Sequence, residues 1–206
     1  MTGNADLAAT SIALDDTFGF GSLTFNSAGA VSISEAGATT LSGTNTASSL
    51  DLDSTAGITN AASASLTVTN NADLNGTSIA LGDQTSDAIN FGSLTVNSAG
   101  AVVIAEDSAT VLSGTSTAGS LDLDSTASIT DDGTADLTVT GIADLAGTSI
   151  ALDDTFDFGS LTFNSAGSVV IADASATDLS RTSKAGSQDL DTTASITKDA
   201  TTDITL

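Results

Sequence analysis

The 206-residue sequence contains no cysteine, histidine, proline, tryptophan or tyrosine, and its aromatic side chains are limited to seven phenylalanines. Without cysteine the chain can form neither a disulfide nor a thiolate metal site. Without histidine it lacks the usual zinc ligand and the usual general base. A core built with so few aromatic side chains must consist of small aliphatic residues, which suit a narrow core of constant width. These absences argue against an enzyme.

Basic residues are also scarce, since three lysines and arginines stand against 26 aspartates and glutamates, for a net charge of -23. Such a chain cannot neutralise nucleic-acid phosphates, and an anionic membrane surface repels it. No stretch approaches the roughly 20 apolar residues of a transmembrane helix. The first residues lack the basic and apolar regions of a signal peptide, so an exported protein would carry its signal outside this chain. We expect neither nucleic acid nor membrane insertion.

What the sequence does contain is a repeat. One block reads FGSLTFNSAG at 20–29, FGSLTVNSAG at 91–100 and FGSLTFNSAG at 158–167. The similarity extends outward until three units, 2–68, 69–139 and 140–206, account for everything after Met1. The four extra residues of the middle unit fall within Gly82–Phe91, which predicts a surface loop there. Residue 206 would continue naturally into another residue 2, as in a longer array or in a subunit that stacks end to end.

Short alternating segments recur within each unit. Examples are Leu94–Val96, Leu121–Leu123 and Leu137–Val139, which place aliphatic residues on one face and Thr or Asp on the other. Small polar stretches such as NSAG and DSTA separate them and turn readily. No 3.6-residue apolar stripe persists, which argues against helices. Disorder is disfavoured by the positive mean hydropathy of +0.23 and by the regular aliphatic residues.

Strands this short, with turns this frequent, predict an all-β fold in which the whole chain, 1–206, forms one continuous parallel β-solenoid. The segment starts at Leu94, Leu121, Leu137 and Leu161 average near 22 residues per coil, which gives about three coils per unit. Four coils of about 17 residues remain an alternative by the same spacing. Three coils would stack inward leucines in columns and would separate outward aspartates by two threonines. The predicted outward ladder is Thr24, Asp51, Thr67, Thr95, Asp122, Thr138, Thr162, Asp189 and Thr205.

Paired carboxylates are the first candidates for chemistry. They form doublets at 15–16, 131–132 and 153–154, and Asp-x-Asp motifs at 51–53, 122–124 and 189–191. Oxygen ligands of this kind suit Ca²⁺. The sequence nevertheless lacks both the EF-hand spacing and the glycine-rich nonapeptide of calcium-binding β-rolls. We therefore expect no cofactor and no dedicated metal site, and we keep Ca²⁺ binding as an alternative to carboxylates that only promote solubility.

The three basic residues, Arg181, Lys184 and Lys198, all fall in the third unit, where the other units have Gly, Thr and Asn or Asp. They indicate either a local site or a charged end that discourages stacking. Rows of Thr and Ser also suggest an ice-binding face, but that would need a regular Thr-x-Thr in every coil.

The strings LTVNSAGAVVI at 94–104 and LDLDSTASIT at 121–130 resemble the repeats of large bacterial surface and secreted proteins, of the filamentous-haemagglutinin-like or autotransporter-passenger type. The resemblance covers the whole chain through compositional motifs, and the unit is longer than the repeat of the best-known members. It implies a right-handed parallel β-solenoid at the cell surface that works as a stalk, adhesin or matrix fibre. We expect a non-catalytic structural module of an extracellular rod or self-stacking filament. The rival is a Ca²⁺-dependent or glycan-binding adhesin segment.

Overall fold

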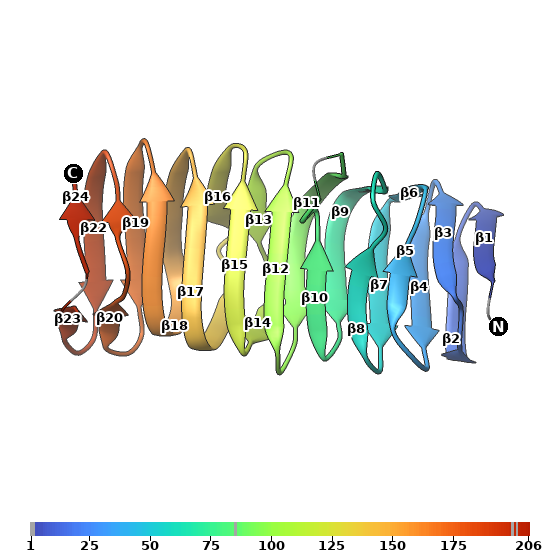
Figure 1. Ribbon diagram of the computed structural model, residues 1–206, viewed down its shortest axis with the longest axis horizontal. Coiled ribbons are helices and arrows are strands. Elements are labelled where there is room, and N and C mark those ends of the chain that lie inside the picture. The colour runs from blue at the N-terminus through green and yellow to red at the C-terminus, as the bar shows by residue number, and fades with distance from the viewer. Residues whose placement is uncertain (1–2, 85, 199, 201) are drawn as a thin grey trace.

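The computed structural model describes residues 3–84, 86–198, 200 and 202–206, which form 24 strands and no helix. Among the described residues the strands pair in parallel, and the two ends of the chain lie at opposite ends of a rod (Figure 1). The predicted all-β, parallel β-solenoid is therefore confirmed, with about ten turns. The described residues include no helix with the length and apolar character needed to span a membrane.

The strands, in chain order, have the following bounds: β1 Asn4–Ala9, β2 Ile12–Phe18, β3 Ser22–Ser27, β4 Ala30–Glu35, β5 Thr39–Leu41, β6 Thr44–Ala47, β7 Ser49–Ser54, β8 Gly57–Asn60, β9 Ser65–Asn75, β10 Ser78–Leu81, β11 Ala88–Asn97, β12 Ala101–Glu106, β13 Thr110–Leu112, β14 Thr115–Ala118, β15 Ser120–Ser125, β16 Ser128–Asp131, β17 Asp136–Gly147, β18 Ser149–Ser165, β19 Ser168–Asp173, β20 Thr177–Leu179, β21 Ser183–Lys184, β22 Ser187–Thr192, β23 Ile196–Lys198 and β24 Ile204–Thr205.

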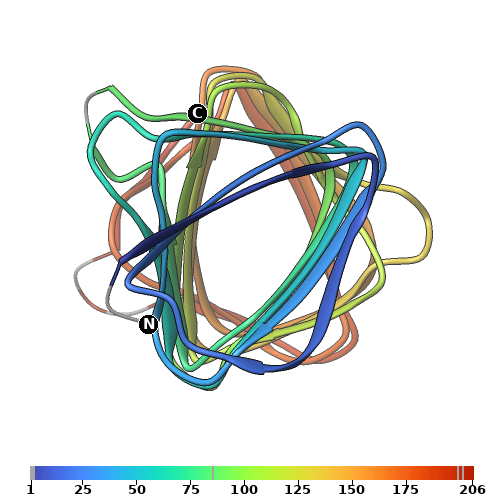
Figure 2. The ribbon, with the colours of Figure 1, turned by 90° about the vertical axis from the view of Figure 1, so that its right-hand side faces the viewer.

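Each turn of the chain runs along three faces of a triangular coil (Figure 2). The residues that lie opposite each other on successive turns are 18 apart at Asn4 and Ser22, and 23 apart at Ile79 and Val102. The number of residues per turn of the solenoid varies because the loops differ in length. The strands keep their parallel pairing from turn to turn. Coils of about 17 residues, the alternative allowed by the sequence, are wrong.

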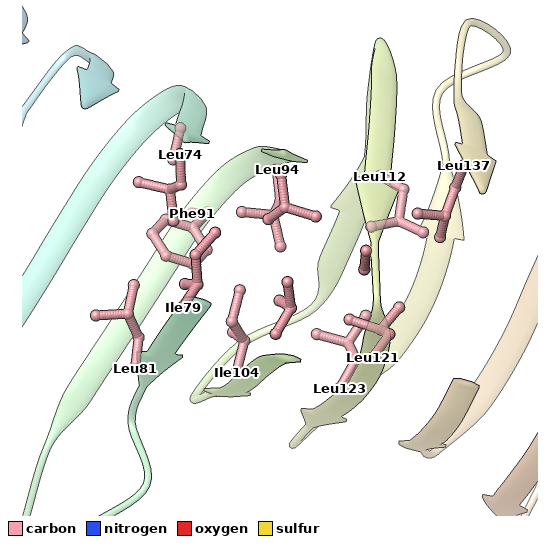
Figure 3. Close-up of a cluster of buried hydrophobic side chains, with 14 of the residues drawn as sticks. Leu74, Ile79, Leu81, Phe91, Leu94, Ile104, Leu112, Leu121, Leu123 and Leu137 are labelled. Atoms are coloured by element: carbon pink, nitrogen blue, oxygen red, sulfur yellow. The ribbon is translucent and has the colours of Figure 1, made fainter. Parts of the chain in front are cut away.

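Aliphatic side chains stack on one another inside the coil (Figure 3). Leu94 shows the pattern: the residues in register beneath it are Ala72, Leu50, Val31 and Ile12, and none of the five side chains is more than 8% exposed. Each fully buried aliphatic side chain of this size contributes about 1.5–3 kcal/mol through the hydrophobic effect. The predicted stacking of small aliphatic residues on successive turns is confirmed, and it forms one cluster along the rod.

Several long strands pass around a corner without a turn. In β9, residues 65–68 pair with β6 and residues 72–75 pair with β7, so the two halves lie on different faces. The same bend in β11 falls at Gly92, where the register with β9 shifts. A Cβ atom on Gly92 would lie 2.2 Å from the carbonyl oxygen of Thr69, so only glycine lets the two backbones approach this closely.

A strand that bends around a corner counts as two segments, one for each face on which it lies. The second unit then has ten segments: the second half of β9, β10, both halves of β11, β12, β13, β14, β15, β16 and the first half of β17. Ten segments on three faces make three and a third turns. Each unit therefore begins one face further around the rod than the unit before it, and the predicted count of about three coils per unit omitted this third of a turn.

Asn26, Asn97 and Asn164 occupy equivalent positions in the three units and show this rotation. Each lies in a different column, where a column is the set of residues in register on successive turns. The columns are Ala8, Asn26, Thr46 and Thr67 for the first unit, Ser34, Asp53, Asn75 and Asn97 for the second, and Ala105, Asp124, Ala146 and Asn164 for the third. The predicted ladder from Thr24 to Asp51 to Thr67 is consequently wrong. Asp51 instead lies between Ser32 and Asp73.

The insertion of the middle unit lies where the sequence predicted. Residues 82–84, 86 and 87 form no strand and lie between β10 and β11, and Asp83 and Gln84 are exposed. Thr85, which belongs to the predicted insertion, lies outside the described residues.

Candidate functional site

Two groups of aspartates form where one unit meets the next. At the first acidic junction, defined as Asp51, Asp53 and Asp73, the Asp-x-Asp motif of β7 lies against β9, with Asp51 opposite Asp73. Neighbouring parallel strands are about 4.8 Å apart, so these carboxylates repel one another. Partial burial, with the charges of Asp51 and Asp53, raises the pKa of Asp73. The Asn75 side chain donates a hydrogen bond of 3.3 Å to Asp73, which partly offsets the repulsion.

The second acidic junction consists of Asp122, Asp124 and Asp144, and it repeats this geometry with Asp122 opposite Asp144. Partial burial and the charges of Asp124 and Asp144 raise the pKa of Asp122. Here a cation is also present, because Nη1 of Arg181 lies 3.2 Å from Oδ2 of Asp144. With side chains 63% and 30% exposed, this ion pair contributes at most about 1 kcal/mol.

A third acidic group, Asp131, Asp153 and Asp154, brings two of the predicted doublets together. Among the described residues it is where three carboxylates offer oxygens within 4.8 Å of one another. Asp131 accepts backbone hydrogen bonds from Asp153 (3.0 Å) and Gly133 (3.2 Å), and Asp154 accepts one from Ala135 (3.1 Å). Partial desolvation and the neighbouring Asp131 carboxyl raise the pKa of Asp154. The group has the oxygen ligands that Ca²⁺ takes, while these bonds already hold two loops in place.

The remaining predicted doublet stands apart from these groups. Asp15 and Asp16 are exposed on β2. The Asp189 and Asp191 carboxylates of β22 lie opposite Val170 and Ala172, which carry no charge.

Sequence reasoning missed three buried acids at equivalent positions. Glu35, Glu106 and Asp173 are 2–3% exposed at the ends of β4, β12 and β19. Glu106 accepts hydrogen bonds from the Phe91 amide (2.9 Å) and from the Ser108 and Thr110 hydroxyls (2.8 and 2.7 Å). Burial raises its pKa. The signal was present, because an acid precedes a threonine by four residues in every unit. These carboxylates satisfy backbone donors at a corner and have no free face for chemistry.

The three basic residues each contact a different neighbour. Arg181 reaches Asp144, Lys198 donates a hydrogen bond of 3.3 Å to the Thr202 carbonyl, and Lys184 lies on β21 opposite Asn164. Within the described part of the chain, they share no contact that would define the local site suggested by their clustering in the third unit.

An open groove of about 830 Å³ runs beside the loop of the middle unit. Asp87, Glu106, Asp107 and Asp124 contribute to its walls. Three of these carboxylates already accept hydrogen bonds: Glu106 as described above, Asp87 from the Asn60 side chain at 2.7 Å, and Asp107 from the Ile89 amide at 3.0 Å. The groove is acidic and suits only a cationic or neutral ligand.

A family model described as repeats of unknown function (DUF5649) matches residues 99–164. The matched stretch covers 66 residues, or about one unit, and runs from the second unit into the third. No curated protein and no solved structure matches the chain. Similarity to a repeat family agrees with the tandem units and the β-solenoid, and it carries no information about chemistry.

Proposed function

We propose that the chain is a structural repeat module without catalytic activity, a section of an extracellular rod, stalk or self-stacking filament. The observation that supports this is the single apolar core, which continues with parallel strand pairing through all three units. Ten turns at the spacing of parallel strands span about 48 Å, so each unit adds about 16 Å of stiff length. Such a module works as a rigid spacer that keeps the parts of a longer assembly a fixed distance apart.

A location at the cell surface is supported by the resemblance to filamentous-haemagglutinin-like and autotransporter-passenger repeats. The excess of acidic side chains, with a net charge of -23, keeps such a rod soluble and separate from anionic cell surfaces. The partners that fit it are further repeats of a longer array or a second copy of the chain, because a strand edge at the end of a sheet accepts another strand.

The rod can be tested by small-angle X-ray scattering on the 206-residue chain and on a tandem duplication of it. We expect a constant cross-section and a maximum length that increases by about 48 Å on duplication. A duplicated chain that folds back on itself, with a broader cross-section, would contradict the rod. Antibodies that label intact cells of the source organism would test the surface location.

An adhesin segment that depends on Ca²⁺ or binds glycans is the second candidate, favoured by the group of Asp131, Asp153 and Asp154. Titration calorimetry with Ca²⁺ and thermal unfolding with EDTA distinguish the two. The rod should respond weakly, through charge screening alone, and equally in Asp153→Asn/Asp154→Asn. Stoichiometric binding that this double variant abolishes would favour the adhesin.

A further inference from the structure

The first and last turns of the chain carry strand edges whose internal equivalents pair with each other. β22 is equivalent to β7 and β15, and these pair with the second halves of β9 and β17. β1 is the equivalent of those two half-strands. Among the described residues, β22 pairs with β19 alone and β1 with β3 alone. The free edge of β22 and the free edge of β1 are therefore complementary.

The two edges also lie on the same face. Because successive segments of the chain take the three faces in turn, this face carries, in order, β1, β3, β6, the first halves of β9 and β11, β13, β16, the start of β18, β19 and β22. The segment that leads into β13 bonds to the first half of β11 through the Asp107 amide and the Ile89 carbonyl, and the last residue of β13, Leu112, pairs across the corner with Leu94. Each unit begins one face further around the rod than the unit before it. After three units, the next unit would therefore begin on the same face as the first. A second copy can therefore continue the rod by translation along its axis, without rotation.

Apolar side chains at the last turn lack the cover that their equivalents have. Ile196 is 49% exposed, whereas the equivalent Ile58 and Ile129 are 0% exposed. Leu190 of β22 and Leu7 of β1 are likewise only partly buried. Another turn of solenoid would cover these side chains, which favours a second copy of the chain as the partner that packs on this end.

The register of the internal junction defines the contact between copies. Leu121, Asp122 and Leu123 lie opposite Ala143, Asp144 and Leu145. If the third unit meets the first unit of the next copy in the same register, Gln188, Asp189 and Leu190 lie opposite Ala5, Asp6 and Leu7 of that copy. Asp6, Asp189 and Asp191 would then form a third junction of the same acidic kind.

This junction would have no compensating cation. At the second acidic junction the cation is Arg181, which lies about two turns beyond Asp144, and the equivalent residue two turns beyond Asp6 is Gly43. The strands packed on either side, β19 and β3, present no charge outward. Asp173, the titratable group on β19, is buried and accepts a hydrogen bond from Thr177. Three carboxylates would thus approach one another unopposed.

We propose that a second copy of this chain docks β1 against β22 in this register, and that docking requires protons or cations to neutralise Asp6, Asp189 and Asp191. The inference rests on the rod proposed above and adds to it a partner and a control. At both internal junctions, burial and neighbouring carboxylates raise the pKa of aspartates. A docked state with such raised pKa values binds more protons than separate copies, so association strengthens as the pH falls and weakens as it rises.

The test is sedimentation velocity at pH 7 and low salt over a range of concentrations. Because acidification toward the isoelectric point of about 4.1 also promotes unspecific aggregation, substitutions at neutral pH are decisive. Asp6→Asn/Asp189→Asn/Asp191→Asn should form linear oligomers where the parent chain is monomeric, with association at least ten-fold tighter. The matched control, Asp51→Asn/Asp53→Asn/Asp73→Asn, removes the same charges from an internal junction and should stay monomeric.

Gly43→Arg offers a second variant. The φ angle of Gly43 is 63°, close to the 60° that Arg181 adopts, and an added Cβ would meet no atom nearer than 3.5 Å. The new guanidinium should tighten association at neutral pH, and 0.5 M salt should reduce that gain. A folded domain fused before β1 should abolish association in every variant. The inference is overturned if the first triple variant stays monomeric, or if both triple variants associate equally. The rod itself would still stand or fall on its scattering profile.

Discussion

Asp51 lies directly opposite Asp73 on the next turn of the solenoid, although the two belong to different sequence units. The pKa of Asp73 is raised by burial and by Asp51 and Asp53, so its charge opposes folding at neutral pH. The carboxyl is partly solvated, which limits the effect to about 0.2–1 kcal/mol. Asp73→Asn should therefore raise the melting temperature at pH 7 by about 1–3 °C.

The sign of the pH dependence follows from the raised pKa of Asp73. Its folded state holds a proton more tightly than the unfolded state does, so the penalty is present above the folded pKa and disappears as the pH falls below the unfolded value near 3.8. The gain from Asp73→Asn should shrink between pH 7 and pH 4 in thermal melts followed by circular dichroism. Asp83→Asn, in the exposed loop, serves as control. An equal gain in both variants would show a net-charge effect alone.

Glu106 is expected to matter for stability. Glu106→Ala would leave the Phe91 amide and the Thr110 hydroxyl unsatisfied in the interior, at a cost of about 1–3 kcal/mol. Glu106→Gln keeps an acceptor and should cost less. Because burial raises the pKa of Glu106, the parent chain gains stability relative to Glu106→Gln as the pH falls from 7 toward 4.5. Urea unfolding at both pH values measures this difference, and a difference that does not change with pH would contradict the assignment.

Gly92→Ala should destabilise the corner of β11 strongly. The added Cβ would lie 2.2 Å from the Thr69 carbonyl oxygen and 2.9 Å from that of Asn70, both of them backbone atoms that cannot rotate away. We expect a loss above about 2 kcal/mol, the range of overpacked interiors. Gly37→Ala is the matched control, since nothing lies within 4 Å of its added Cβ. Similar melting temperatures for the two variants would mean that β11 can shift away from β9.

The sequence predicted the strands because Leu, Val and Ile alternate with Thr, Ser and Asp between turns of small polar residues. It did not predict the third of a turn. Strands such as β9 pass their corner within a continuous pattern, so no turn signal marks the change of face. Leu121 and Leu137, taken as starts of successive coils, stand in different columns, because Leu121 pairs toward Ala143 and Leu137 toward Phe156.

The candidate site was predictable only in its residue types. Acidic doublets were visible, but Asp131 and Asp153 meet because one local turn is about 22 residues long, a length that depends on loop size. The buried Glu106 escaped notice because an acid at the end of a strand, here followed by Asp107, resembles the solvated acids of a surface turn. Its pairing with Thr110 becomes evident only when the three units are compared at that spacing.

The rotation of one face per unit makes the units interchangeable, and this can be tested by deletion. Removing 69–139 joins Val68 to Thr140, which preserves the junction sequence found between the second and third units. We expect a cooperative two-unit rod about 32 Å long by small-angle scattering, two thirds of the parent length. Removing 69–138 leaves one extra residue, Val139, which would shift the following strand by one position and turn its apolar side chains outward. That control should melt earlier or fail to fold. If both deletions behave alike, the pairing between units does not depend on register, and the column arrangement of the core is wrong.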